Sequence, residues 1–115
     1  MKIVRMGRQE GKSTELIKLA SENWYYILCL DRRRATYLFE QARRMGLDMP
    51  FPITVNELPL NSPYIRGLLI DDVDHVLQKL VGIPKIVQCT TSCEVEVKNT
   101  GVEPKCEVDI NNLFE

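Results

Sequence analysis

KIVRMGRQEGKST, residues 2–14, is the stretch around which the rest of the chain is organised. The short apolar run Ile3, Val4 and Met6 leads directly into a glycine-containing turn, and a helical pattern opens within residues 11–14. Strand, loop and helix in this order are the context that a phosphate-binding loop requires. The stretch therefore predicts a phosphate site at the start of the first helix.

The chemistry of such a loop is specific. Backbone N–H groups that glycines expose cradle phosphate oxygens at the positive end of the helix. In Gly11-Lys12-Ser13-Thr14, Lys12 supplies a mobile cation and Ser13 a hydroxyl group for Mg²⁺. The same short pattern also occurs by chance in exposed turns, so a second feature has to support it.

Length and charge exclude several classes of protein. A chain of 115 residues forms one domain and leaves no room for a second catalytic domain. With 15 basic and 16 acidic residues it has no overall electrostatic bias toward nucleic acid or membrane. No apolar run approaches the roughly 18 residues of a membrane span, and the first residues do not resemble a signal peptide. We expect a cytoplasmic protein without a membrane partner.

Strand and helix patterns alternate along the chain. Helical spacing of apolar residues predicts helices over residues 13–22, 32–45 and 73–80. Apolar runs predict strands over 24–30, 53–55, 67–70 and 86–87, the run 24–30 being covered on both faces. Asp31 is expected to cap the second helix and Gly46 to close it. The fold class is α/β, with a mainly parallel sheet flanked by helices.

The end of the chain changes character. Residues 94–97 and 106–110 alternate with period two around Asn99-Thr100-Gly101, which predicts a β-hairpin. We therefore divide the chain into a nucleotide-binding core, residues 1–92, and a hairpin tail, residues 93–115, packed on the same domain and capping an edge of its sheet.

An acidic pair forms the second chemical feature. Asp71 and Asp72 follow the apolar run 67–70, so their carboxylates are expected at the C-terminal edge of the sheet, where ligands bind in open α/β folds. Asp71 is placed to hold the Mg²⁺ shell, and Asp72 to orient an attacking water or to cap the third helix. The alternative is that both aspartates are helix caps.

These two features resemble the P-loop NTPases, in particular the branch with an additional strand between the phosphate loop and the acidic motif. Residues 11–14 are similar to the end of Walker A, residues 68–72 to Walker B, and residues 88–92 to the polar strand end of that branch. The resemblance covers residues 1–92 and implies a three-layer fold that binds ATP and Mg²⁺.

A finer resemblance concerns the loop itself. Residues 7–13, Gly-Arg-Gln-Glu-Gly-Lys-Ser, are similar to the variant phosphate loop of phage terminase large subunits. The family pattern implies that Arg8 contacts the γ-phosphate and acts in catalysis with Asp72, while Ser13 and Asp71 hold the metal. The nucleotide-binding residues that it implies are Gly7, Gln9, Gly11, Lys12, Ser13 and Thr14.

Two positions depart from the family pattern. Met6 stands where the usual motif has its first glycine, although the terminase-type loop tolerates this loss. Asp72 stands where the branch generally carries glutamate, and its shorter side chain lies farther from the nucleophilic water. These departures predict nucleotide binding with slow hydrolysis.

Cysteine usage argues against a structural zinc site. Cys29 lies inside an apolar run and is expected to be a buried thiol. Cys89, Cys93 and Cys106 form no CxxC pair and have no neighbouring histidine, which disfavours zinc. A disulfide is not expected in a reducing compartment.

Two interpretations are open for several polar residues. The arginines at positions 32–34 and 43–44 either contact a DNA backbone or, in the last turn, complement the helix dipole. His75 is expected to be exposed or to cap its helix. Thr90 and Thr91 either sense the γ-phosphate or are ordinary strand-end residues.

The sequence leaves two functions open. The first is a small phage-like ATP-binding protein, a slow Mg²⁺-dependent ATPase in DNA processing, with nucleotide and DNA or another protein as partners. The second is a degenerate, non-hydrolysing fold that serves as a protein-interaction module, with the hairpin edge pairing a partner strand. A small-molecule kinase is a weaker third option, and the oligomeric state is not determined by the sequence.

Overall fold

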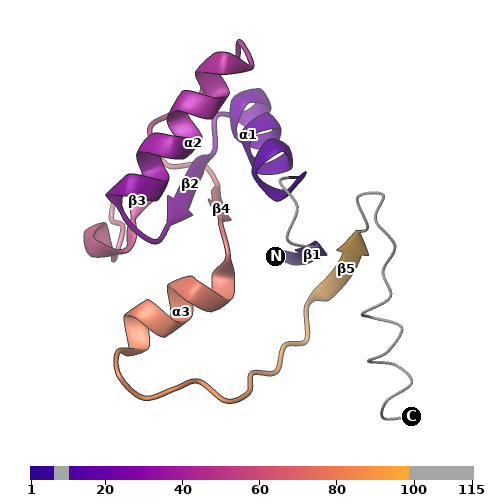
Figure 1. Cartoon of the computed structure of the whole chain (residues 1–115), viewed down its shortest axis with the longest axis vertical. Helices are drawn as coiled ribbons and strands as arrows, with labels where there is room; N and C mark the ends of the chain where they lie inside the picture. Colours follow the sequence, from indigo (N-terminus) through magenta and orange to yellow (C-terminus); the bar gives the residue numbers. More distant parts are fainter. Residues whose placement is uncertain (7–10, 99–115) are drawn as a thin grey trace.

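The computed structural model describes residues 1–6 and 11–98 of the chain as an α/β protein (Figure 1). Strands and helices alternate along most of it, as the hydrophobic pattern predicts. In chain order the elements are β1 (Lys2–Met6), α1 (Gly11–Asn23), β2 (Tyr26–Cys29), α2 (Arg32–Arg44), β3 (Ile53–Thr54), the 3-10 helix η1 (Val55–Glu57), β4 (Leu68–Ile70), α3 (Val73–Val81) and β5 (Glu94–Lys98).

A three-stranded parallel sheet forms the centre of the protein. Its order is β3-β2-β4, and Leu28 on β2 is aligned with Ile53 on one side and Ile70 on the other. Parallel pairing brings the C-terminal ends of all three strands to one edge of the sheet. Any polar residues that follow these strands therefore meet there.

Strand β2 is covered on both faces, which confirms the prediction from its continuous apolar run. Ile27 and Cys29 pack with residues of α1 and α2, whereas Leu28 packs on the opposite face with Ile53 and with Val76 of α3. Successive side chains of a strand point to opposite faces, so a run without polar residues requires this double cover. Helices thus lie on both sides of the central sheet.

The helix predictions are confirmed within a few residues at each end. Asp31 caps α2, because its Oδ1 accepts a hydrogen bond of 3.0 Å from the backbone N–H of Arg34. Gly46 follows α2 with a left-handed φ of 75°, a conformation that glycine adopts without strain. None of the helices in residues 1–6 and 11–98 has the length and apolar character needed to cross a membrane.

The expectation of a single sheet is wrong for the described residues, because β1 pairs with β5 in a separate two-stranded parallel sheet. A surface ion pair accompanies this pairing. β1 carries Lys2 and β5 carries alternating acidic residues, and Lys2 forms a 2.7 Å ion pair with Glu96. Lys98 of β5 also reaches Glu15 of α1 at 2.8 Å, which joins this small sheet to the first helix.

The predicted hairpin tail is described only in its first arm. Residues 94–97 do form a strand, within β5, but the partner of β5 is β1. The second predicted arm, residues 106–110, lies outside the described residues.

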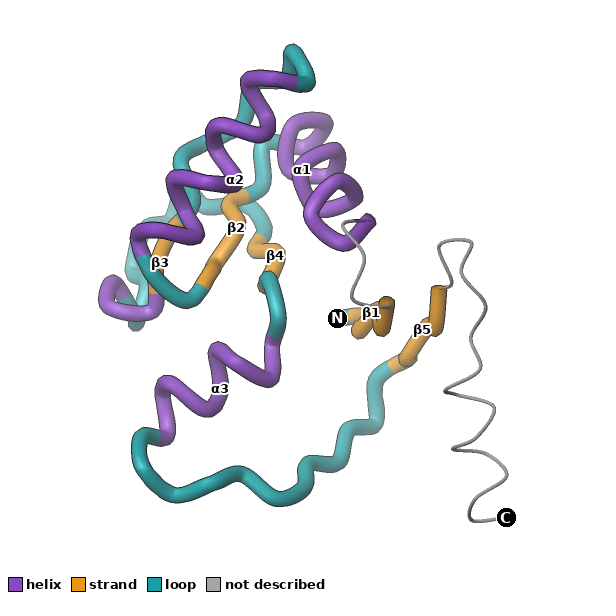
Figure 2. Tube along the Cα trace, in the orientation of Figure 1, coloured by secondary structure: helices purple, strands orange, loops and turns teal. Residues whose placement is uncertain are grey.

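The predicted strand at residues 86–87 is wrong. Residues 82–93 contain no strand and run as a long loop from α3 to β5 (Figure 2). The Gln78 side chain takes the place of a neighbouring strand: its amide donates to the carbonyls of Gly82 and Pro84 at 2.9 Å and accepts from Ile86 N–H at 3.0 Å. Val87 is 89% exposed.

Two isoleucines test the importance of the double cover. Ile27 is 1% exposed and Ile83 is 97% exposed. We expect Ile27→Ala to lower the free energy of unfolding by about 2–5 kcal/mol, because it leaves a cavity between β2 and its helices. Ile83→Ala, the matched control, should change it by less than about 0.5 kcal/mol. Urea denaturation followed by circular dichroism measures both, and equal effects would contradict this description of the core.

Candidate functional site

The candidate site lies at the C-terminal edge of the central sheet. The turn after β2 carries Asp31, and the turn after β4 carries Asp71 and Asp72. The backbone N–H of Asp71 donates to the carbonyl of Leu28 on β2 at 2.9 Å. This hydrogen bond extends the β2–β4 ladder and holds the turn after β4 against β2. This is the sheet edge at which open α/β folds bind ligands.

Asp71 is the most buried acidic group of this edge, with 3% of its surface exposed. Its Oδ2 accepts a 2.8 Å hydrogen bond from Arg34 Nε in an ion pair. Its Oδ1 is buried and has no hydrogen-bond partner among the residues that the structure describes. A buried carboxylate oxygen without a partner is costly in free energy and is a position where a ligand or ion is expected.

Arg34 connects Asp71 to the first helix. Its Nη2 donates to Ser13 Oγ at 3.4 Å, and its guanidinium carbon lies 5.0 Å from the centre of the Tyr37 ring. Ser13 is itself buried, in the first turn of α1. One guanidinium thus contacts both of the residues that the sequence predicts as metal ligands.

The charge of Arg34 is firmly held. Desolvation acts to lower the pKa of its guanidinium, but the hydrogen bond and charge of Asp71, with the charge of Asp72, outweigh it and raise the pKa. The guanidinium therefore remains a permanent cation beside the buried carboxylate.

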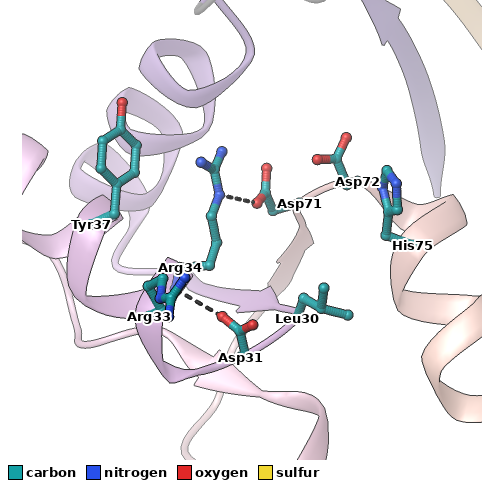
Figure 3. Close-up of a pocket in the computed structure, with 8 residues that line it drawn as sticks. All are labelled: Leu30, Asp31, Arg33, Arg34, Tyr37, Asp71, Asp72 and His75. Carbon is teal, nitrogen blue, oxygen red and sulfur yellow. Dashed lines mark hydrogen bonds and ion pairs between the residues drawn. The ribbon is translucent and has the colours of Figure 1, made fainter.

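An open pocket of about 480 Å³ lies at this edge (Figure 3). Its walls come from the ends of β2 and β4 and from the first turns of α2 and α3. The lining residues are Leu30, Asp31, Arg33, Arg34, Tyr37, Asp71, Asp72 and His75. Ser13 is not among them; Arg34 is the residue that contacts both Ser13 and the pocket.

Asp72 adopts a left-handed backbone conformation, with φ 59° and ψ 69°, at the N-cap position of α3. Its side chain makes no capping hydrogen bond; instead its carbonyl accepts from the N–H groups of His75 and Val76 at 3.0 and 3.1 Å. The alternative that both aspartates are helix caps is therefore only partly confirmed. Asp72 occupies the N-cap position, but its side chain makes no capping hydrogen bond, and Asp71 is not a cap. Aspartate adopts this conformation more readily than most non-glycine residues, and Trp24, away from the pocket, has a similar φ of 57°.

Asp72, Asp74 and His75 form a second group of metal-ligating side chains, with ligand atoms within 4.8 Å of one another. The sequence pattern predicts His75 as an exposed or capping side chain and does not assign it to such a group. Its exposure is confirmed, since His75 and Asp74 side chains are 67% and 79% exposed. Asp72 lies at the N-cap position and Asp74 and His75 in the first turn of α3, so their closeness in the sequence is the signal that indicates the group.

The phosphate loop is only partly described. Gly7, Arg8 and Gln9 lie outside the described residues, so their predicted roles stay predictions. Gly11, Lys12 and Thr14 belong with Ser13 to the first turn of α1, which contains no acidic residue. The positive end of this helix is therefore not neutralised by an acidic side chain of its own first turn.

Arg34 is the site residue whose role the sequence does not reveal. The sequence groups it with Arg32 and Arg33 as a contact for DNA or phosphate, but it points to Asp71, whereas both neighbours are exposed. One feature of the sequence could have indicated this contact. Arg34 lies one helical turn after the capping residue Asp31, which places it at the same sheet edge as Asp71. The basic pair in the last turn of α2, residues 43–44, complements the helix dipole there.

The other polar residues that the sequence singles out do not line the pocket. Thr90 and Thr91 are exposed and do not line it, and Thr91 Oγ1 accepts a 3.0 Å hydrogen bond from Cys93 N–H. Cys89 and Cys93 are free thiols, while Cys106 lies outside the described residues.

Comparison of the chain with protein-family models, with curated proteins and with solved structures finds no match. The assignment of function therefore depends on the site itself.

Cys29 provides a test of the electrostatics at this edge. It is fully buried, as predicted, and desolvation together with the charges of Asp71 and Asp31 raises the pKa of its thiol to about 11. At pH 8 we expect Cys29 to resist alkylation, because only about one thiol in a thousand is ionised and the thiolate is the reactive form. Exposed Cys89 should react under the same conditions.

Iodoacetamide labelling followed by peptide mass spectrometry measures both thiols in one sample. Cys29 should become reactive when urea unfolds the protein. Labelling of Cys29 as fast as Cys89 in the folded protein would contradict the described burial.

Proposed function

We propose that the chain is a small Mg²⁺- and ATP-binding protein of the P-loop type, with slow or no hydrolysis. One observation carries this proposal: Ser13 at the start of α1 and Asp71 at the end of β4 contact the same guanidinium, while Asp71 Oδ1 is buried without a partner among the described residues. A phosphate-loop serine and an acidic strand end are the two features that the sequence motif requires in proximity.

The residues present fit the proposed metal. Mg²⁺ prefers oxygen ligands and is held by one or two protein groups together with water and phosphate oxygens. Ser13 Oγ and the Asp71 carboxylate are such ligands, and both are mostly shielded from solvent. When bound, Mg²⁺ neutralises charge on the β- and γ-phosphates of the nucleotide.

The other residues of the site have separate roles in this proposal. The backbone N–H groups at the start of α1 donate to phosphate oxygens, and Lys12 adds a cation. Arg8 neutralises charge on the terminal phosphate, as the terminase-like loop implies. Asp72, which lines the pocket, orients the attacking water.

A three-layer P-loop fold is part of this proposal. Helices on both faces of the central parallel sheet and an acidic residue at its C-terminal edge support it. The separate pairing of β1 with β5 does not follow the single-sheet expectation. Contact of Lys98 with Glu15 nevertheless keeps this small sheet next to α1.

The interaction module remains the second candidate, and exposed apolar groups favour it. Val95 and Val97 of β5 are about half exposed, and so is much of the apolar surface of α3. Such surface on a small sheet is suited to pairing or packing against a protein partner. DNA as a partner is supported by the exposed side chains of Arg32 and Arg33.

Nucleotide binding is tested by calorimetric titration with ATP in the presence and absence of Mg²⁺. We expect Lys12→Ala to weaken Mg²⁺-dependent ATP binding by roughly 10- to 100-fold, because a charged hydrogen bond to phosphate is lost. Lys18→Ala, in the same helix at an exposed position, is the matched control and should bind as wild type does.

Absence of ATP binding in the wild type, or equal binding by the Lys12 and Lys18 variants, would overturn the nucleotide-binding proposal. Release of inorganic phosphate then separates the two functions. ATP binding with background phosphate release, with and without added DNA, favours the interaction module over the ATPase.

A further inference from the structure

We infer that the Arg34 guanidinium is the built-in counter-cation of the Ser13–Asp71 site and has to leave it before a divalent cation can bind. This inference rests on the proposed function, since it concerns the same two metal ligands. It gives Arg34 a positioning and regulatory role that neither the motif nor the strand pattern assigns.

Charge compensation keeps Arg34 at Asp71 in the free protein. Asp71 is 3% exposed, and a buried carboxylate without a partner is strongly destabilising. Arg34 supplies the compensating charge through the 2.8 Å contact of its Nε with Asp71 Oδ2. The free protein therefore holds its guanidinium in place for reasons of stability.

The position of the guanidinium also conflicts with that of a metal. It contacts Ser13 Oγ through Nη2 at 3.4 Å, so it lies between the two oxygen ligands that a metal would share. A divalent cation at these oxygens would lie within a few ångströms of a permanent positive charge. Guanidinium and metal thus compete for one site.

Tyr37 lies beside the Arg34 guanidinium, on the side of the open pocket. The guanidinium carbon lies 5.0 Å from the centre of the Tyr37 ring, and both residues line the open pocket. A cation over an aromatic face is stabilised even when exposed. In this inference the displaced side chain moves into the open pocket, where the Tyr37 ring and the charge of Asp72 stabilise its cation.

The competition has a functional consequence. In the free protein, only the molecules in which Arg34 has left the site can bind the metal. The apparent metal affinity is therefore the intrinsic affinity multiplied by the fraction of such molecules. Bound phosphate attracts a displaced guanidinium, because guanidinium and phosphate form strong charge-assisted hydrogen bonds. Arg34 thereby makes metal binding depend on nucleotide and weakens the binding of divalent cations to the empty protein.

The test measures Mn²⁺ binding without nucleotide, using the electron paramagnetic resonance signal of free Mn²⁺. Arg34→Gln should bind Mn²⁺ about tenfold more tightly than wild type, because the competing charge is gone. Arg43→Gln, an exposed position in the last turn of the same helix that does not line the pocket, should match wild type. The double variant Arg34→Gln with Asp71→Asn should lose the gain.

Equal Mn²⁺ affinity of Arg34→Gln and wild type would overturn the inference, as would a gain that persists in the double variant. This experiment contains no ATP, so its failure is distinct from a failure of the calorimetric titration, which overturns the proposed function. The Mn²⁺ measurement therefore tests the inference about Arg34, and the calorimetric titration tests the proposed function, independently of each other.

A measurement on the wild type covers the case in which Arg34→Gln does not fold. During a titration with Mg²⁺ alone, the Nε–H resonance of Arg34 and the carboxyl resonance of Asp71 should shift together with one midpoint. A shift of Asp71 while Arg34 stays unchanged would overturn the competition, and so would no shift in either at saturating Mg²⁺.

Discussion

The buried carboxylate of Asp71 is the constraint on which the organisation of this protein depends. With 3% of its surface exposed, it requires a positive charge close by, and Arg34 supplies one at 2.8 Å. The backbone holds both groups in place: the β2–β4 ladder fixes the turn that carries Asp71, and the Asp31 cap fixes the start of α2 that carries Arg34. Ser13 then joins α1 to the same ion pair.

The double cover of β2 explains why this edge is available for binding. Because helices occupy both faces of the central sheet, its polar groups gather at the C-terminal ends of β2 and β4. The pocket opens there, lined by the Arg34–Asp71 ion pair and by Asp72. The cation exchange that we propose, in which a bound metal replaces the Arg34 guanidinium, would join these observations.

Local patterns predicted the local features well. The apolar run of β2 required cover on both faces, Asp31 was positioned to cap α2, and the acidic pair ended β4, all as the structure shows. Features that depend on distant residues could not be predicted. Arg34 and Asp71 are 37 residues apart, and no spacing rule joins them. No strand forms at residues 86–87, where the Ile86 N–H donates to the Gln78 side chain instead of to a neighbouring strand. The pairing of β1 with β5, almost the whole described chain apart, is likewise not indicated by any local pattern.

The most direct test of the Ser13–Asp71 metal site is paramagnetic broadening of the backbone N–H resonances by Mn²⁺ in the presence of ATP. We expect the strongest broadening around Ser13 and Asp71, on two segments that only the fold brings together. Broadening centred on Asp74 and His75, the exposed ligand group at the start of α3, with Ser13 unaffected, would contradict the proposed site.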